Sequence, residues 1–171
     1  MTAKIYELGE KGENKMEEVT IFDVAKHFLN RVDIGAGSVM THLKLQKMCY
    51  YAQAWHLVFA GKPMFIQEFQ AWDHGPVCPE LWQAYRGYRW QPIPRPEQFD
   101  TVFGAEQNDT LEEVWDTYGR FDAKYLERLT HKEEPWIKAR GNCLSGEYCD
   151  NVISHQSMKD YYRNYLNDGE N

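Results

Sequence analysis

Apolar residues return at helical spacing directly after a polar N-terminal stretch. Between residues 21 and 32 they fall every three or four positions, which is the period of an amphipathic α-helix. Thr20 and Asp23 are spaced as a capping pair and mark the start of this helix. Residues 1–17, by contrast, mix Gly, Glu, Lys and Asn without a clear period, and we expect a flexible tail there.

The second predicted helix is apolar on nearly every side. Thr41 can cap its start, and Gly61 followed by Pro63 predicts its end near residue 60. Its apolar positions spread round most of the circumference and leave a polar strip near Gln46 and Gln53. Because such a helix is buried on all sides, we expect it at the centre of a bundle.

The segment after this helix has the features of a strand and a tight turn. Residues 65–72 alternate in part between apolar and polar side chains and predict a short extended segment. In the turn that follows, Gly75 tolerates unusual dihedral angles and Pro76 favours extended backbone before it. Pro79 suits the first position of another helix, and the prolines within residues 91–96 predict a loop or an edge strand.

Shorter helical patterns fill the rest of the chain. They cover residues 109–118, 122–130 and 135–141, and a last one starts at Ser154 or Ser157. Together the patterns predict a mainly α fold, with six or seven helices and one or two short strands in a single compact domain. We place this helical domain at residues 18–167.

Composition shows that the chain can build a core. It has 171 residues, 43% of them hydrophobic, with 6 Trp, 11 Tyr and 8 Phe. This length suits one domain, and the apolar content is well above that of disordered chains.

The four cysteines, Cys49, Cys78, Cys143 and Cys149, include no C-x-x-C pair and no zinc-finger spacing. The N-terminal residues lack the apolar core of a secretory signal, and no apolar run is long enough to span a membrane. We therefore expect a cytoplasmic protein that has reduced thiols and does not enter a membrane.

The net charge of −7 is unevenly distributed. Residues 41–96 contain six Lys or Arg and three acidic residues, whereas residues 97–171 contain eight basic and sixteen acidic ones. Nucleic-acid binding depends on clustered Lys and Arg that neutralise phosphates, so direct nucleic-acid recognition is not expected of this acidic chain. The C-terminal charge is typical of a solvated surface.

We find no pattern of catalytic or cofactor-binding residues. The six histidines stand singly and not at metal-ligand spacing, and glycine-rich phosphate loops are absent from the sequence. Cys78 with His74 would be a nucleophile and its base, but nothing nearby marks an oxyanion hole. We expect no catalytic residue, no metal and no cofactor, and hence a protein that is not an enzyme.

Three segments carry a resemblance to a known family. They are LKLQKMCYYAQAW at residues 43–55, AWDHGPVCPELWQAY at 71–85 and EEPWIKARG at 133–141. In this order they resemble the Panacea domain of the SocA-like antitoxins, a phage-associated domain, and the resemblance extends over residues 18–165. The positions that match the family motif, which we interpret as mostly structural, are Leu43, Lys44, Leu45, Gln46, Lys47, Tyr50, Tyr51, Trp55, Ala71, Trp72, Gly75, Pro76, Val77, Pro79 and Trp136.

The resemblance implies a helical antitoxin from a bacterial chromosome, prophage or other mobile element. Its partner would be a cognate toxin protein, encoded by an adjacent gene and neutralised by direct contact. A relative that delivers its toxin to a protease suggests an alternative, a proteolytic adaptor that acts with a cytoplasmic protease. A small enzyme is a more distant alternative, because a fold does not by itself settle a function.

Two further hypotheses concern particular side chains. Lys44, Gln46 and Lys47 form a polar run in a very apolar helix, so they need hydrogen-bond partners or exposure. We expect Gln46 to bond the backbone of the 72–77 turn and so join the first two motifs. Binding surfaces are rich in aromatic and arginine side chains, and our candidate partner-binding residues are Trp72, Tyr85, Arg86, Tyr88, Arg89 and Trp90.

Overall fold

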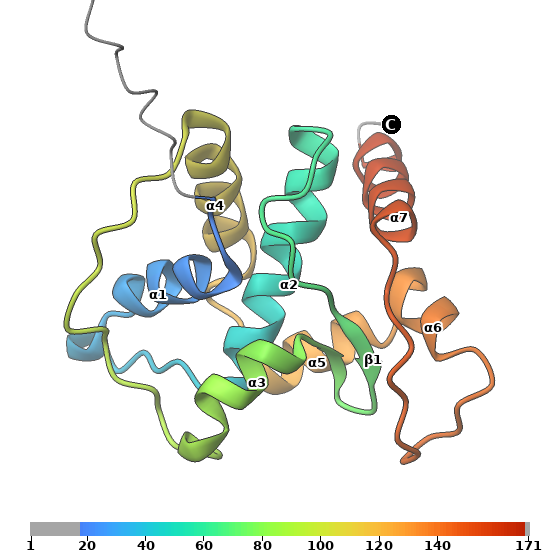
Figure 1. Ribbon diagram of the computed structural model, residues 1–171, viewed down its shortest axis with the longest axis horizontal. Helices are drawn as coiled ribbons and strands as arrows, with labels where there is room; N and C mark the ends of the chain where they lie inside the picture. Colours follow the sequence, from blue (N-terminus) through green and yellow to red (C-terminus); the bar gives the residue numbers. More distant parts are fainter. Residues whose placement is uncertain (1–17, 170–171) are drawn as a thin grey trace, which may run out of the picture.

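A computed structural model describes residues 18–169 of the chain, and the predicted tail at 1–17 lies outside this range. Within these residues the fold has seven α-helices and one two-stranded antiparallel sheet, which confirms the mainly α prediction (Figure 1). The elements are α1 (Ile21–Arg31), α2 (His42–Phe59), β1 (Gln70–Trp72), β2 (Gly75–Val77), α3 (Pro79–Tyr85), α4 (Ala105–Tyr118), α5 (Ala123–Thr130), α6 (Glu134–Arg140) and α7 (His155–Asp168). Two short 3₁₀ turns cover Ile34–Ala36 and Arg86–Tyr88.

Helix α2 is the centre of the fold, as its sequence predicted. It packs against α1, α3, α4, α5, α7 and β2, and Figure 1 shows it running between α4 and α7. Every residue from Leu45 to Leu57 is buried, including the polar side chains of the strip at Gln46 and Gln53. Buried polar groups need internal hydrogen-bond partners, so the other elements must supply them.

The predicted helix ends are mostly confirmed. Thr20 and Asp23 form a capping box on α1, and the Thr41 hydroxyl accepts a hydrogen bond from the Lys44 amide at the start of α2. Gly61 has a φ of +74° just beyond the end of α2. Helix α4 begins at Ala105, four residues before the predicted 109, because Gly104 acts as its N-cap and donates to the Gln107 side chain.

Only the end of the predicted extended segment is a strand. The Gln53 side chain donates to the Phe65 carbonyl and accepts from the Met64 amide, so this side chain satisfies backbone groups that a neighbouring strand would otherwise bond. Strand β1 starts at Gln70 and pairs antiparallel with β2 around the Asp73–His74 turn. The segment before α7 bonds to the other edge of β1, because the Ala71 amide donates to the Asn151 carbonyl at 2.9 Å.

Candidate functional site

The first two motifs are joined by two buried side chains of α2. The Cys78 amide donates to Gln46 Oε1 at 2.9 Å, and Gln46 Nε2 donates to the Cys78 carbonyl at 3.3 Å. Lys47 Nζ donates to the Pro76 carbonyl at 3.1 Å. Gln46 therefore joins the motifs as expected, but it bonds one residue beyond the predicted 72–77 turn. The contact to the turn itself comes from Lys47.

Gly75 makes room for the buried lysine. Its φ is +100°, and a Cβ atom there would lie 2.7 Å from Lys47 Cε and 2.8 Å from Thr130 Oγ1. Both the dihedral angle and the space require glycine. Lys47 is fully buried, and this desolvation lowers the pKa of its amine to about 7, although the Glu127 carboxylate opposes the shift.

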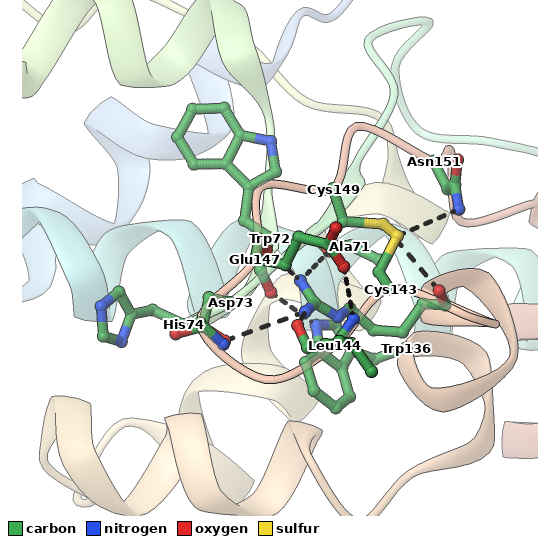
Figure 2. A network of polar contacts seen from close by, with 12 residues as sticks. Ala71, Trp72, Asp73, His74, Trp136, Cys143, Leu144, Glu147, Cys149 and Asn151 are labelled. Atoms are coloured by element: carbon green, nitrogen blue, oxygen red, sulfur yellow. Dashed lines mark hydrogen bonds and ion pairs between the residues drawn. A yellow bond between two sulfur atoms is a disulfide. The ribbon is translucent and has the colours of Figure 1, made fainter.

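The third motif bonds to the same hairpin from α6 (Figure 2). Trp136 Nε1 donates to the Trp72 carbonyl at 2.8 Å, and the buried Arg140 guanidinium donates to the Ala71 carbonyl at 3.2 Å. Arg140 also donates to the Leu144 and Glu147 carbonyls in the loop that follows α6. The three motif segments, far apart in the sequence, thus meet at the β1–β2 hairpin and fix its position.

A groove lies between this hairpin, the start of α2, and α3 with the turn that follows it. Its volume is about 380 Å³. We call it the tryptophan–arginine groove, and its lining residues are His42, Leu43, Gln46, Trp72, His74, Val77, Trp82, Arg86, Arg89, Trp90 and Lys124. Four of the six candidate partner-binding residues line it, namely Trp72, Arg86, Arg89 and Trp90.

The other two candidates, Tyr85 and Tyr88, do not line the groove. Tyr85 is half-buried and packs against the core and His42, with ring centroids 6.4 Å apart. Tyr88 packs against Tyr85, with ring centroids 6.3 Å apart. Sequence reasoning also missed Trp82, although its position four residues before Arg86 in the same helical pattern could have indicated a shared face.

The groove presents aromatic surface together with positive charge. Trp90 is 86% exposed, the highest value among the exposed large hydrophobic residues of the described chain. Trp72 and Trp82 have ring centroids 5.7 Å apart, and the Arg86 guanidinium lies 5.4 Å from the Trp82 ring centroid. The lining includes three cationic side chains and no acidic one, although Lys124 is paired with Glu127 next to it at 3.2 Å. This combination is typical of a binding surface.

Comparison with known proteins identifies the family. A family model described as "Antitoxin SocA-like, Panacea domain" matches residues 45–137, which is more than half of the chain. The chain belongs to this family. Antitoxin SocA of Caulobacter vibrioides (strain NA1000 / CB15N) is 30% identical to it over 132 residues, which cover 67% of this chain and 70% of that protein. No solved structure matches significantly.

In this Panacea domain the prediction of four reduced cysteines is wrong for two of them. Cys143 and Cys149 form a disulfide, with Cα atoms 6.1 Å apart (Figure 2). The loop between them folds back on itself, since the Glu147 amide donates to the Leu144 carbonyl at 3.0 Å. The spacing of six residues does not reveal this turn. Cys49 and Cys78 are buried free thiols, as expected.

Cys78 and His74 were weighed from the sequence as a nucleophile and its base. In the structure each of them bonds to a different carboxylate. His74 Nδ1 lies 2.9 Å from Glu127 Oε1, and Cys78 Sγ donates to Glu80 Oε2 at 3.1 Å. Burial raises the pKa of the Cys78 thiol to about 12, so it carries its proton at neutral pH.

The buried histidines of α2 have structural partners. His42 Nε2 lies 3.2 Å from Gln46 Nε2, and His56 Nδ1 lies 2.9 Å from Thr110 Oγ1. Burial lowers the pKa of His42 to about 4. Across residues 18–169, no group of three or more His, Cys, Asp or Glu side chains is placed to hold a metal ion. Over the same range, no helix has both the length and the apolar character that a bilayer span requires.

Proposed function

We propose that this chain is a cytoplasmic antitoxin that neutralises a cognate toxin by direct protein–protein contact and catalyses no reaction itself. The toxin would be the product of an adjacent gene. Membership of the antitoxin SocA-like family supports the antitoxin role, and the related protein from Caulobacter vibrioides carries the name Antitoxin SocA. The tryptophan–arginine groove is the surface that we assign to the toxin.

The observation that carries this assignment is the exposed Trp90 beside two arginines in a groove built on the motif hairpin. A large aromatic ring in water is costly to leave uncovered, and tryptophan and arginine are the residue types that contribute most to binding energy in interfaces. The three motifs fix the hairpin that forms one wall. The groove is therefore preorganised, which lowers the entropic cost of association.

Charge indicates which part of a toxin would bind there. The groove is lined by basic but not acidic side chains, whereas the whole chain has a net charge of −7. A partner segment with acidic and apolar side chains would match the groove and would be repelled by much of the remaining surface. We propose that the bound toxin segment has this composition.

The test is a binding measurement between the purified full chain and the product of the neighbouring gene. The double variant Arg86→Glu/Arg89→Glu should lower the affinity roughly 100-fold or more, because it replaces attraction by repulsion. The matched control is Arg128→Glu/Arg163→Glu, which makes the same change in net charge at exposed arginines outside the groove. The control should bind as the wild type does.

Trp90→Ala supplies an independent test, with Ile66→Ala as its control at another exposed apolar side chain. Trp90→Ala should lose toxin rescue in cells and keep its melting temperature. Wild-type affinity in both groove variants would overturn the assignment of the groove. The proteolytic-adaptor alternative is distinguished by toxin levels, which would fall in the presence of this chain only when a cytoplasmic protease is active.

A further inference from the structure

A second cavity lies away from the tryptophan–arginine groove and shares no lining residue with it. It opens between α4, α5, α7 and the C-terminal half of α2, and its volume is about 440 Å³. Its aromatic walls include Trp55, Tyr118, Phe121, Tyr161, Tyr162 and Tyr165. We call it the aromatic cleft. Its size is in the range of small-molecule sites.

The aromatic walls are held in place by contacts with one another. Trp55 Nε1 donates to the Tyr118 hydroxyl at 2.9 Å, and Tyr118 stacks on Tyr51 with ring centroids 3.9 Å apart. The rings of Trp55 and Tyr162 have centroids 5.3 Å apart. Such rings carry negative charge on their faces and attract cations.

Glu133 lines this cleft and is only 6% exposed. Its Oε1 atom accepts hydrogen bonds from the Tyr51 hydroxyl at 2.6 Å and from the Tyr162 hydroxyl at 3.1 Å. Among residues 18–169, no cationic side chain is paired with it. Arg120 lies at the cleft, but it is exposed and its guanidinium lies 4.8 Å from the Phe121 ring centroid.

Burying a carboxylate in this position costs solvation free energy, and the two hydrogen bonds that it accepts do not require a carboxylate. Burial raises the pKa of Glu133 to about 7, because the charged form is poorly solvated there. The amide oxygen of a glutamine could accept the same two tyrosine bonds without any charge. What a glutamate adds at this position is the ability to become negative inside a ring of aromatic side chains.

We propose that the aromatic cleft binds a small organic cation of the alkylammonium or quaternary ammonium class, with Glu133 as counter-ion and the aromatic rings as walls. Glu133 is the buried carboxylate of the cleft, whereas Glu113, the other acidic residue of its lining, is exposed. One buried carboxylate with aromatic neighbours suits a weakly hydrated organic cation. Metal ions such as Ca²⁺ and Mg²⁺ need several oxygen ligands, and the described chain places no such cluster. This site is separate from the toxin contact, so either proposal can fail alone.

The experiment titrates the purified full chain with choline chloride and, separately, with its uncharged isostere 3,3-dimethylbutan-1-ol. Binding is followed by calorimetry and by the NMR signal of the Trp55 indole N–H, which is bonded to a wall residue of the cleft. Choline should shift this signal saturably and bind at least 10-fold more tightly than the isostere. Equal affinity for the two probes, or no binding of choline, would overturn the proposal.

Variants locate the binding. Glu133→Gln should lower choline affinity at least 10-fold and leave the affinity for the isostere unchanged. Tyr165→Ala removes a 62% exposed wall residue, so the variant should fold and bind choline several-fold more weakly. The control Tyr148→Ala removes a 73% exposed tyrosine outside the cleft and should bind as the wild type does. Choline binding that is unchanged in folded Tyr165→Ala contradicts the proposed site.

Discussion

Replacing Gln46 with leucine tests whether the motif hairpin depends on one buried amide. The Gln46 side chain is 2% exposed. Within residues 18–169, the Cys78 amide donates one hydrogen bond, and the acceptor is Gln46 Oε1. The Cys78 carbonyl is different, because it also accepts from the Trp82 amide at 2.9 Å and keeps this partner in the variant. Leucine has a similar size, so the main loss is one buried donor without an acceptor, together with the contact between Gln46 Nε2 and His42 Nε2.

The magnitude follows from this accounting. A buried donor without a partner costs about 1–3 kcal/mol, and we take roughly 2 kcal/mol for Gln46→Leu. In a domain of this size 1 kcal/mol changes the melting temperature by about 2–4 °C, so the expected decrease is roughly 4–8 °C. The loss should also appear locally, as faster hydrogen exchange at the Cys78 amide.

Thermal unfolding followed by circular dichroism measures the global effect, and a urea titration shows whether the midpoint moves at constant slope. The control is Gln156→Leu on α7, where the exposed amide bonds to the Asp160 side chain and replacement should change stability by less than about 0.5 kcal/mol. A melting temperature for Gln46→Leu within 1 °C of the wild type, with unchanged exchange at Cys78, would refute the reasoning.

Three further predictions concern other parts of the domain. Gly75→Ala should lower the free energy of unfolding, measured in urea, by at least about 1–3 kcal/mol, the cost of the strained dihedral angle alone. The added Cβ would also collide with Lys47, and wild-type stability would contradict the prediction. The pKa of Glu133 is raised from 4.5 to about 7 in the folded state, so the folded state binds this proton more tightly than the unfolded state does. The free energy of unfolding of the wild type should therefore fall relative to that of Glu133→Gln as the pH rises from 4.5 to about 7, by roughly 3 kcal/mol, whereas parallel pH profiles would exclude the shift. Peptide mapping without reductant should find Cys143 linked to Cys149, and reduction should lower stability by about 2 kcal/mol, as expected for so short a loop; two free thiols at these positions would show the pairing to be wrong.

Local patterns were sufficient to predict the helices and most of their ends. The capping residues Thr20 and Thr41 and the stop at Gly61 act on backbone groups within a few positions, so their effect can be inferred from neighbouring residues alone. The apolar circumference of α2 likewise placed it at the centre, because a helix without a polar face has to be covered on all sides. The motif residues gave the family, and comparison confirmed it.

The sequence could not decide which distant groups meet, because hydrogen bonds to backbone carbonyls and the closure of cavities carry no local signature. It named Gln46 as a link between the motifs, yet the tertiary structure decided that the partner is Cys78 and that Lys47 bonds the turn. It grouped six candidate partner residues by their closeness along the chain, but only the packing of α3 on α2 separates the four that line a groove from Tyr85 and Tyr88. The aromatic cleft around Glu133 arises in the same way, from chain segments that only folding brings together. The disulfide depends on how the short loop between Cys143 and Cys149 folds back.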